Sequence, residues 1–102
     1  MKLQITIQKD TQTIRLAGDL DIYTVESGRD ALAAMLSDGH GLDLDVSGVE
    51  NCDAAGIQLL LAARRSALAA DKTFFIHTPA PVIEKCGELL GLPSQSWLAP
   101  SR

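Results

Sequence analysis

Carboxylate, imidazole and thiol side chains are the groups of this chain that could do chemistry. Five aspartates stand near apolar segments, namely Asp19, Asp21, Asp43, Asp45 and Asp53. Asp45 and Asp53 could act as an acid–base pair or bind Mg²⁺. However, Asp43 and Asp45 alternate with apolar residues, which places them on the outer face of a half-exposed strand. Asp53 stands where it would cap a helix, so we expect neither a catalytic residue nor a metal site.

The histidines and cysteines have no spacing typical of a catalytic or metal site. His40 and His77 are far apart in the chain, and neither is paired with a Cys or Asp in a pattern that predicts a nucleophile. Two cysteines, Cys52 and Cys86, are too few for a disulfide framework. We expect both to be reduced and structural, with an exposed Cys52 thiol as the alternative. The sequence predicts no cofactor and no enzymatic activity.

Length and composition indicate one ordinary globular domain over residues 1–102. Apolar residues make up 46% of the 102 residues and charged residues 22%, while aromatic residues reach only 4%, so the core must be aliphatic. The formal net charge of −4 argues against a nucleic-acid partner, which needs clustered Lys and Arg. No apolar run approaches the roughly 18 residues of a membrane span. The start of the chain lacks the apolar core of a signal peptide, so we expect a cytoplasmic protein without membrane insertion.

Residues 42–65 contain the segment that must position these side chains. Leu42, Leu44 and Val46 alternate with polar residues, which is the pattern of a strand with one buried face. The strand is expected to break at Gly48 and to turn through residues 49–52. A helix over residues 54–70 follows, with Asp53 as its cap. Its expected apolar stripe consists of Ile57, Leu60, Leu61 and Leu68.

The remaining periodicities complete an alternating order of strands and helices. Strands are expected at residues 2–8, 13–17 and 73–77, and helices at residues 25–37 and 81–90. Gly18 is expected to end the second strand, and Thr24 to cap the first helix. The residues expected to face the core are Ile14, Leu16, Val25, Ala31 or Leu32, Met35, Leu36, Phe74, Ile76 or Phe75, Val82, Ile83, Cys86, Leu89 and Leu90.

The order β-β-α-β-α-β-α predicts an α/β fold. It has a mixed sheet of four to five strands and helices mainly on one face. The tail after Gly91 is expected to form a short final strand or to pack against the core.

Two motifs resemble those of STAS domains, the fold of bacterial anti-sigma factor antagonists. DLDVSGVENCDAAGIQLLL resembles the family pattern D-L-S-G-V-x-x-x-D-[ST]-[SA]-G-L-x-x-L, and the upstream LAGDLDIYTVE resembles the second signature, L-x-G-x-L-D. Both occur in the expected order and separation, so the resemblance covers nearly the whole chain. It implies the STAS fold and a role as a non-enzymatic module for protein–protein interaction in bacterial signal transduction and transcription regulation.

The loop before the second helix departs from the family pattern at its hydroxyl positions. In the antagonists that the chain resembles, a serine of the D-[ST]-[SA]-G loop is phosphorylated by the partner kinase, and the phosphate drives the partner off. Here the loop reads Asp53-Ala54-Ala55-Gly56. A methyl group cannot accept a phosphoryl group, so we expect partner binding without phosphorylation at this loop.

The resemblance implies a protein partner that binds at this loop. The expected partner-binding residues are Asn51, Cys52, Asp53, Ala54, Ala55, Gly56 and Gln58. The partner is expected to be an anti-sigma factor or a chemotaxis-type histidine kinase. The alternative is the ATPase of a lipid-asymmetry-type ABC transporter, with this chain as its cytosolic STAS subunit. A third hypothesis is a small-molecule binder or an enzyme. The sequence leaves open the partner's identity, phosphorylation at other Ser or Thr residues, and the oligomeric state.

Overall fold

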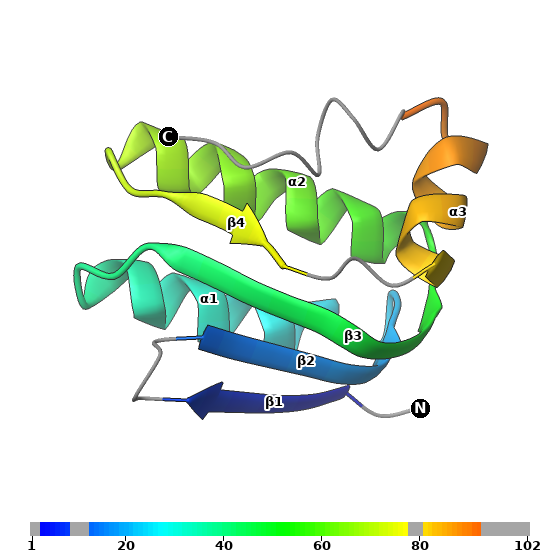
Figure 1. The fold of residues 1–102 in the computed structure, drawn as a ribbon, viewed down its shortest axis with the longest axis horizontal. Coiled ribbons are helices and arrows are strands. Elements are labelled where there is room, and N and C mark those ends of the chain that lie inside the picture. The colour runs from blue at the N-terminus through cyan, green and yellow to red at the C-terminus, as the bar shows by residue number, and fades with distance from the viewer. Residues whose placement is uncertain (1–2, 9–12, 78–80, 93–102) are drawn as a thin grey trace.

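The computed structural model describes residues 3–8, 13–77 and 81–92, which form a four-stranded sheet and three helices (Figure 1). The strands are β1 (Leu3–Gln8), β2 (Thr13–Leu20), β3 (Leu42–Cys52) and β4 (Phe74–Ile76), and the helices are α1 (Val25–Ser37), α2 (Ala54–Ala69) and α3 (Pro81–Leu89). The observed order confirms the predicted β-β-α-β-α-β-α arrangement. The expected final strand in the tail lies outside the described residues.

The sheet is mixed, and its strands follow one another in chain order. β1 pairs antiparallel with β2 as a hairpin, whereas β2 with β3 and β3 with β4 are parallel pairs. Each parallel pair is joined through a helix, α1 in the first case and α2 in the second. These two helices lie side by side on one face of the sheet, and α3 lies near the end of β3 where α2 begins (Figure 1). The carboxyl ends of β2 and β3 therefore meet beside the starts of α1 and α2.

Two strands are longer than the sequence predicts. β2 continues past Gly18 to Leu20, and β3 continues past Gly48 to Cys52. Register shifts on either side of Ala17 and Gly18 let the two strands stay paired, and Gly18 adopts a φ of 100° that a side chain would disfavour. The predicted break at Gly48 is wrong because pairing with a neighbouring strand, which periodicity does not report, keeps the backbone extended.

An aliphatic core fills the space between the sheet and the helices. The predicted inward positions of β2 and β3 are fully buried, as Ile14, Leu16, Leu44 and Val46 illustrate. On the short β4, Phe74 and Ile76 are buried while Phe75 is 36% exposed, which settles the alternative left open there. Alternation alone therefore identified the covered face of the sheet.

The buried face of α2 is wider than the predicted stripe. Ile57 and Leu60 are buried as expected, but Leu61 and Leu68 are only half-buried. Instead, the helix also buries Leu59, Ala63 and Ala67. The reason is that α2 packs against α1 on one side and α3 on the other, as well as against the sheet.

The first helix buries Leu32 and Met35 as predicted, and Val25, Ala31 and Leu36 are half-buried. The prediction fails at the end of α3, where Leu89 is 80% and Leu90 46% exposed. Ile83 and Gly87, one turn apart, hold the core-facing side of α3, so Leu89 falls on the opposite side. No helix within the described residues combines the length and apolarity needed to cross a bilayer.

Candidate functional site

Asp53 joins the start of α2 to the loop between β2 and α1. Its Oδ1 accepts a hydrogen bond from the Gly56 backbone N–H at 3.1 Å, which confirms the predicted helix cap. Its Oδ2 accepts from the Ile22 N–H at 3.2 Å, across 31 residues of sequence. The Asp53 N–H in turn donates to the Leu20 carbonyl at 3.3 Å. One aspartate thus orders two adjacent loops.

The loop between β2 and α1 is closed by Asp21 and Thr24, which are both buried. The Thr24 hydroxyl donates to the Asp19 carbonyl at 2.9 Å, and it accepts from the Asp21 N–H at 3.1 Å. Thr24 occupies the N-cap position of α1, but its side chain caps no helical N–H group, contrary to the prediction. The hydroxyl is used inside the loop instead, so α1 begins without a side-chain cap.

This loop exposes two large side chains that the sequence reasoning did not select. Ile22 is 65% and Tyr23 77% exposed, and Ile22 stands beside the start of α2 because Asp53 binds its N–H. The neighbouring Asn51 side chain donates to Asp19 Oδ1 at 2.7 Å. The sequence signal for Ile22 and Tyr23 is a pair of large, mainly apolar residues inside a polar loop, between the end of a strand and the start of a helix.

The residues predicted to bind a partner divide into a surface group and a packed group. Asn51, Ala54 and Gln58 are exposed, Asp53 and Ala55 are half-buried, and together they form the surface at the start of α2. Gly56 is buried, and a Cβ there would stand 2.3 Å from the Leu20 carbonyl oxygen. Cys52 is half-buried below the loop and makes a weak bond to the Asp53 carbonyl at 3.5 Å. The packed residues hold the loop rather than line its surface.

The two cysteines are free, and Cys52 is an unreactive thiol by its surroundings. Burial first, and then the neighbouring Cys86, raise the pKa of the Cys52 thiol to about 12. A thiol in this state is protonated at neutral pH and is a poor nucleophile. Cys52 accordingly acts as a small apolar side chain between β3, α2 and α3.

The carboxylates that could have formed an acid–base pair lie apart. Asp45 is on the open face of the sheet, where its carboxylate accepts from the Ser47 hydroxyl at 2.7 Å and from the Ser47 N–H at 3.0 Å. These two bonds lower the pKa of Asp45. Asp53 lies beyond the far end of β3, eight residues along the chain and on the order of 25 Å away at about 3.3 Å per strand residue.

The other titratable groups on this face do not assemble a site either. Asp43 pairs with His77 on the same face. No cluster of three potential metal ligands exists among the residues that the structure describes.

A mixed four-stranded sheet covered by helices, with a capped helix starting directly after the central strand, defines an α/β fold like that of the anti-sigma factor antagonists. A family model described as "Mlab, STAS domain" matches residues 3–98, so the chain belongs to the STAS family. Comparison with curated protein sequences gives no match.

Solved structures with the same fold include two anti-sigma factor antagonists. The unphosphorylated antagonist SpoIIAA superposes with a TM-score of 0.66 at 19% identity, over 99% of this chain and 90% of that one. An antagonist from Mycobacterium paratuberculosis gives a TM-score of 0.72 at 21% identity, over 94% and 81%. A structure of Mglu matches over 78% of this chain but only 20% of its own, with a TM-score of 0.60 and 18% identity. At these low identities, the TM-scores show a shared fold.

Proposed function

We infer that this chain is a non-enzymatic signalling module, a single cytoplasmic domain that docks a protein partner through the surface at the start of α2. The fold of the anti-sigma factor antagonists supports an interaction module in general. The observation that carries the proposal is the Asp53–Gly56 loop, which is held by Asp53 on both sides but offers only methyl groups at its two hydroxyl positions. Small side chains at a rigid helix start let a partner approach closely. The partner is an anti-sigma factor or a histidine-kinase-like protein.

Docking is not switched by phosphate at this loop, because Ala54 and Ala55 cannot be phosphorylated. Two other hydroxyls are already engaged in hydrogen bonds. The Thr24 side chain is buried and bonded within its loop, and the Ser47 hydroxyl donates to Asp45 on the open face of the sheet. Stoichiometric phosphorylation of another Ser or Thr by the bound kinase, with loss of binding, would refute docking without any phosphate switch.

The test is affinity capture from native lysate with wild type and Ala55→Asp, followed by mass spectrometry. Aspartate at this position places negative charge in the docking surface, so we expect capture of an anti-sigma factor or kinase to fall at least tenfold. Ala34→Asp is the matched control, because Ala34 is exposed on α1 away from the start of α2. Equal capture by wild type and Ala55→Asp would refute the docking site.

A second candidate function is a cytosolic subunit of an ABC transporter of the lipid-asymmetry type. The observation that favours this function is the description of the matching family model, which reads "Mlab, STAS domain" and does not mention anti-sigma factor antagonists. The same capture experiment separates the two functions: an ABC transporter ATPase among the proteins lost with Ala55→Asp favours the transporter subunit.

A further inference from the structure

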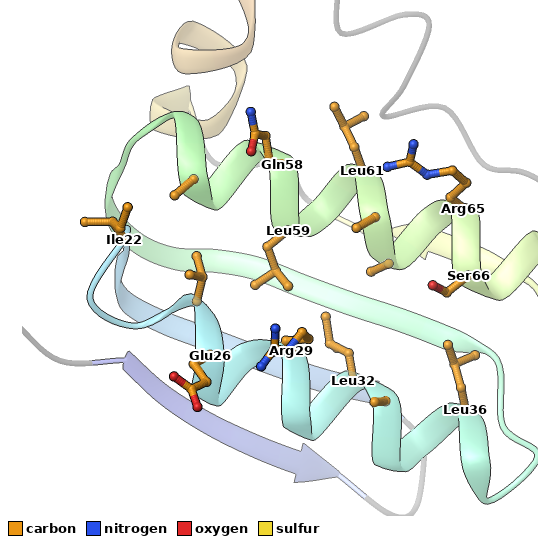
Figure 2. A pocket seen from close by; sticks show the side chains of 15 residues that line it. Ile22, Glu26, Arg29, Leu32, Leu36, Gln58, Leu59, Leu61, Arg65 and Ser66 are labelled. Atoms are coloured by element: carbon orange, nitrogen blue, oxygen red, sulfur yellow. The ribbon is translucent and has the colours of Figure 1, made fainter.

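An open groove of about 940 Å³ runs between α1 and α2 (Figure 2). Leu32 of α1 and Leu59 of α2 point toward one another between the helices, and both are buried in its floor. Leu36 and Leu61 extend the apolar lining and are half-buried. Because the groove is apolar and open along its length, an apolar stripe of another element could be buried in it.

The dimensions of the groove suit a short helix. Its α2 wall extends from Ala55 to Ser66, which is about 16 Å at 1.5 Å per residue, or about three helical turns. The walls carry the exposed alanines Ala33 and Ala62, whose small side chains allow a second helix to come close. An amphipathic helix docking into such a groove is a common mode of recognition.

Charges on the rim indicate the character of that helix. Two arginines, Arg29 and Arg65, and one carboxylate, Glu26, line the groove, although acidic residues outnumber basic ones in the whole chain by 13 to 9. Arg29 has only a long contact of 3.9 Å to Asp30, and both side chains are more than 60% exposed, so that pair contributes little. Arg65 has no ion pair within the described part of the chain. The rim therefore favours acidic side chains on the occupant.

The groove is continuous with the surface at the start of α2. Ala55 and Gln58 belong to both, and Ile22 stands at the same end of the groove in Figure 2. A partner that contacts the start of α2 can thus continue along the groove without a gap. The following inference rests on the proposed function, because it takes both surfaces as parts of one docking site.

We propose that the groove between α1 and α2 binds an amphipathic helix of the protein partner, about three turns long. The apolar stripe of this helix lies on Leu32 and Leu59, and its acidic flank faces Arg29 and Arg65. The start of α2 positions the partner, and the groove selects it by charge.

The first test uses two fluorescein-labelled synthetic peptides and fluorescence anisotropy. Both are fourteen-residue amphipathic helices with the same leucine stripe, one with glutamate flanks and the other with lysine flanks. We expect the glutamate peptide to bind wild type at least tenfold more tightly, and Arg29→Glu/Arg65→Glu to reverse this order. Ala62→Trp should abolish binding by filling the groove, whereas Ala34→Trp, outside it, should not. Equal affinities, or no binding of the glutamate peptide at 1 mM, would overturn the proposal.

The second test separates the groove from the proposed function by partner capture with Ala62→Trp and Ala55→Asp. If the partner is no longer captured by either variant, the result supports one continuous docking site. Loss with Ala55→Asp alone refutes the groove and leaves the proposed docking site standing, and loss with Ala62→Trp alone refutes the site at the start of α2. A dimer of the wild type in sedimentation that Ala62→Trp dissociates, without peptide binding, would assign the groove to a second copy of the chain and overturn the proposal.

Discussion

Asp53 holds the start of α2 in place, because it bonds both to its own helix and to the loop before α1. Replacing it with alanine removes both acceptors and leaves the Gly56 N–H, in a partly buried position, without its cap. We expect Asp53→Ala to lower the free energy of unfolding by about 1–2 kcal/mol in urea titrations.

Asp53→Asn is the matched control for this prediction. The amide keeps one acceptor oxygen, so it can retain one of the two bonds, and its loss of stability should be smaller than that of Asp53→Ala. Equal stability of Asp53→Ala and wild type would show that the two loops hold together without this side chain.

Cys52 provides a prediction about reactivity at the residue scale. Burial is the main cause that raises its pKa to about 12, from an ordinary value of 9.0. In a Cys86→Ser variant, alkylation of Cys52 by iodoacetamide at pH 8 should therefore be at least about 100-fold slower in the native protein than in urea. Comparable rates in the two states would mean that the thiol is open to solvent.

The same shift has a consequence for stability at high pH. The pKa of Cys52 is higher in the folded state than in the unfolded state. The protonated thiol therefore contributes its full share to the free energy of unfolding below about pH 9. This contribution is lost as the pH rises toward about 12. Cys52→Ala should be less sensitive to pH across this interval than wild type, as unfolding titrations at pH 8 and pH 11 would measure.

At the scale of elements, the start of α2 requires a close approach to β2. A Cβ on Gly56 would stand 2.3 Å from the Leu20 carbonyl oxygen and 3.0 Å from the Cys52 sulfur. Since the nearest atom is backbone, the strand or the helix must shift. We expect Gly56→Ala to cost about 1–3 kcal/mol in the free energy of unfolding.

Gly28→Ala is the control, because Gly28 is also a buried glycine, in α1. Its added Cβ would meet the end of the Leu59 side chain at 2.8 Å, which can rotate away, and the end of the Leu3 side chain at an ordinary contact distance of 3.6 Å. Alanine also has a higher helix propensity by up to about 1 kcal/mol, so the two effects offset one another. If Gly56→Ala were no more destabilising than Gly28→Ala, the close packing of α2 on β2 would not be a constraint.

The stability contributed by hydrogen bonds on the open face of the sheet should decrease in acid. The pKa of Asp45 lies below its ordinary value of 3.8, chiefly because the backbone and hydroxyl of Ser47 donate to its carboxylate. A lowered folded pKa means that this contribution to stability is present above about pH 4 and is lost as the pH falls through the folded pKa. Ser47→Ala should thus be less stable than wild type at pH 6, with the difference shrinking by pH 2.5. A difference that does not change with pH would exclude this role for Ser47.

At the scale of the whole molecule, the buried residues form one hydrophobic cluster that every described helix and the sheet share. The radius of gyration of 12.3 Å is close to the roughly 13 Å of a compact chain of this size. We expect one cooperative unfolding transition in urea, with the same midpoint by far-UV circular dichroism and by Cys52 alkylation. Separate midpoints would mean that the elements around Cys52 open independently of the sheet.

The sequence by itself determined the element order, the covered face of β2 and β3 and the capped start of α2. These features depend on neighbours within a few residues: Leu44 alternates with Asp45, and Asp53 stands three residues before the N–H that it caps. The family resemblance followed from the same local stretches, since its motifs lie at the ends of β2 and β3.

Only the tertiary structure decided the features that depend on contacts between distant segments. The end of β3 stays extended past Gly48 because β2 pairs with it, and Ile22 comes to the start of α2 because Asp53 binds it across 31 residues. The groove likewise exists only because α1 and α2 pack side by side, so that Leu32 and Leu59 face one another. Periodicity reports which face of an element is buried, whereas the partner that buries it is chosen by packing in three dimensions.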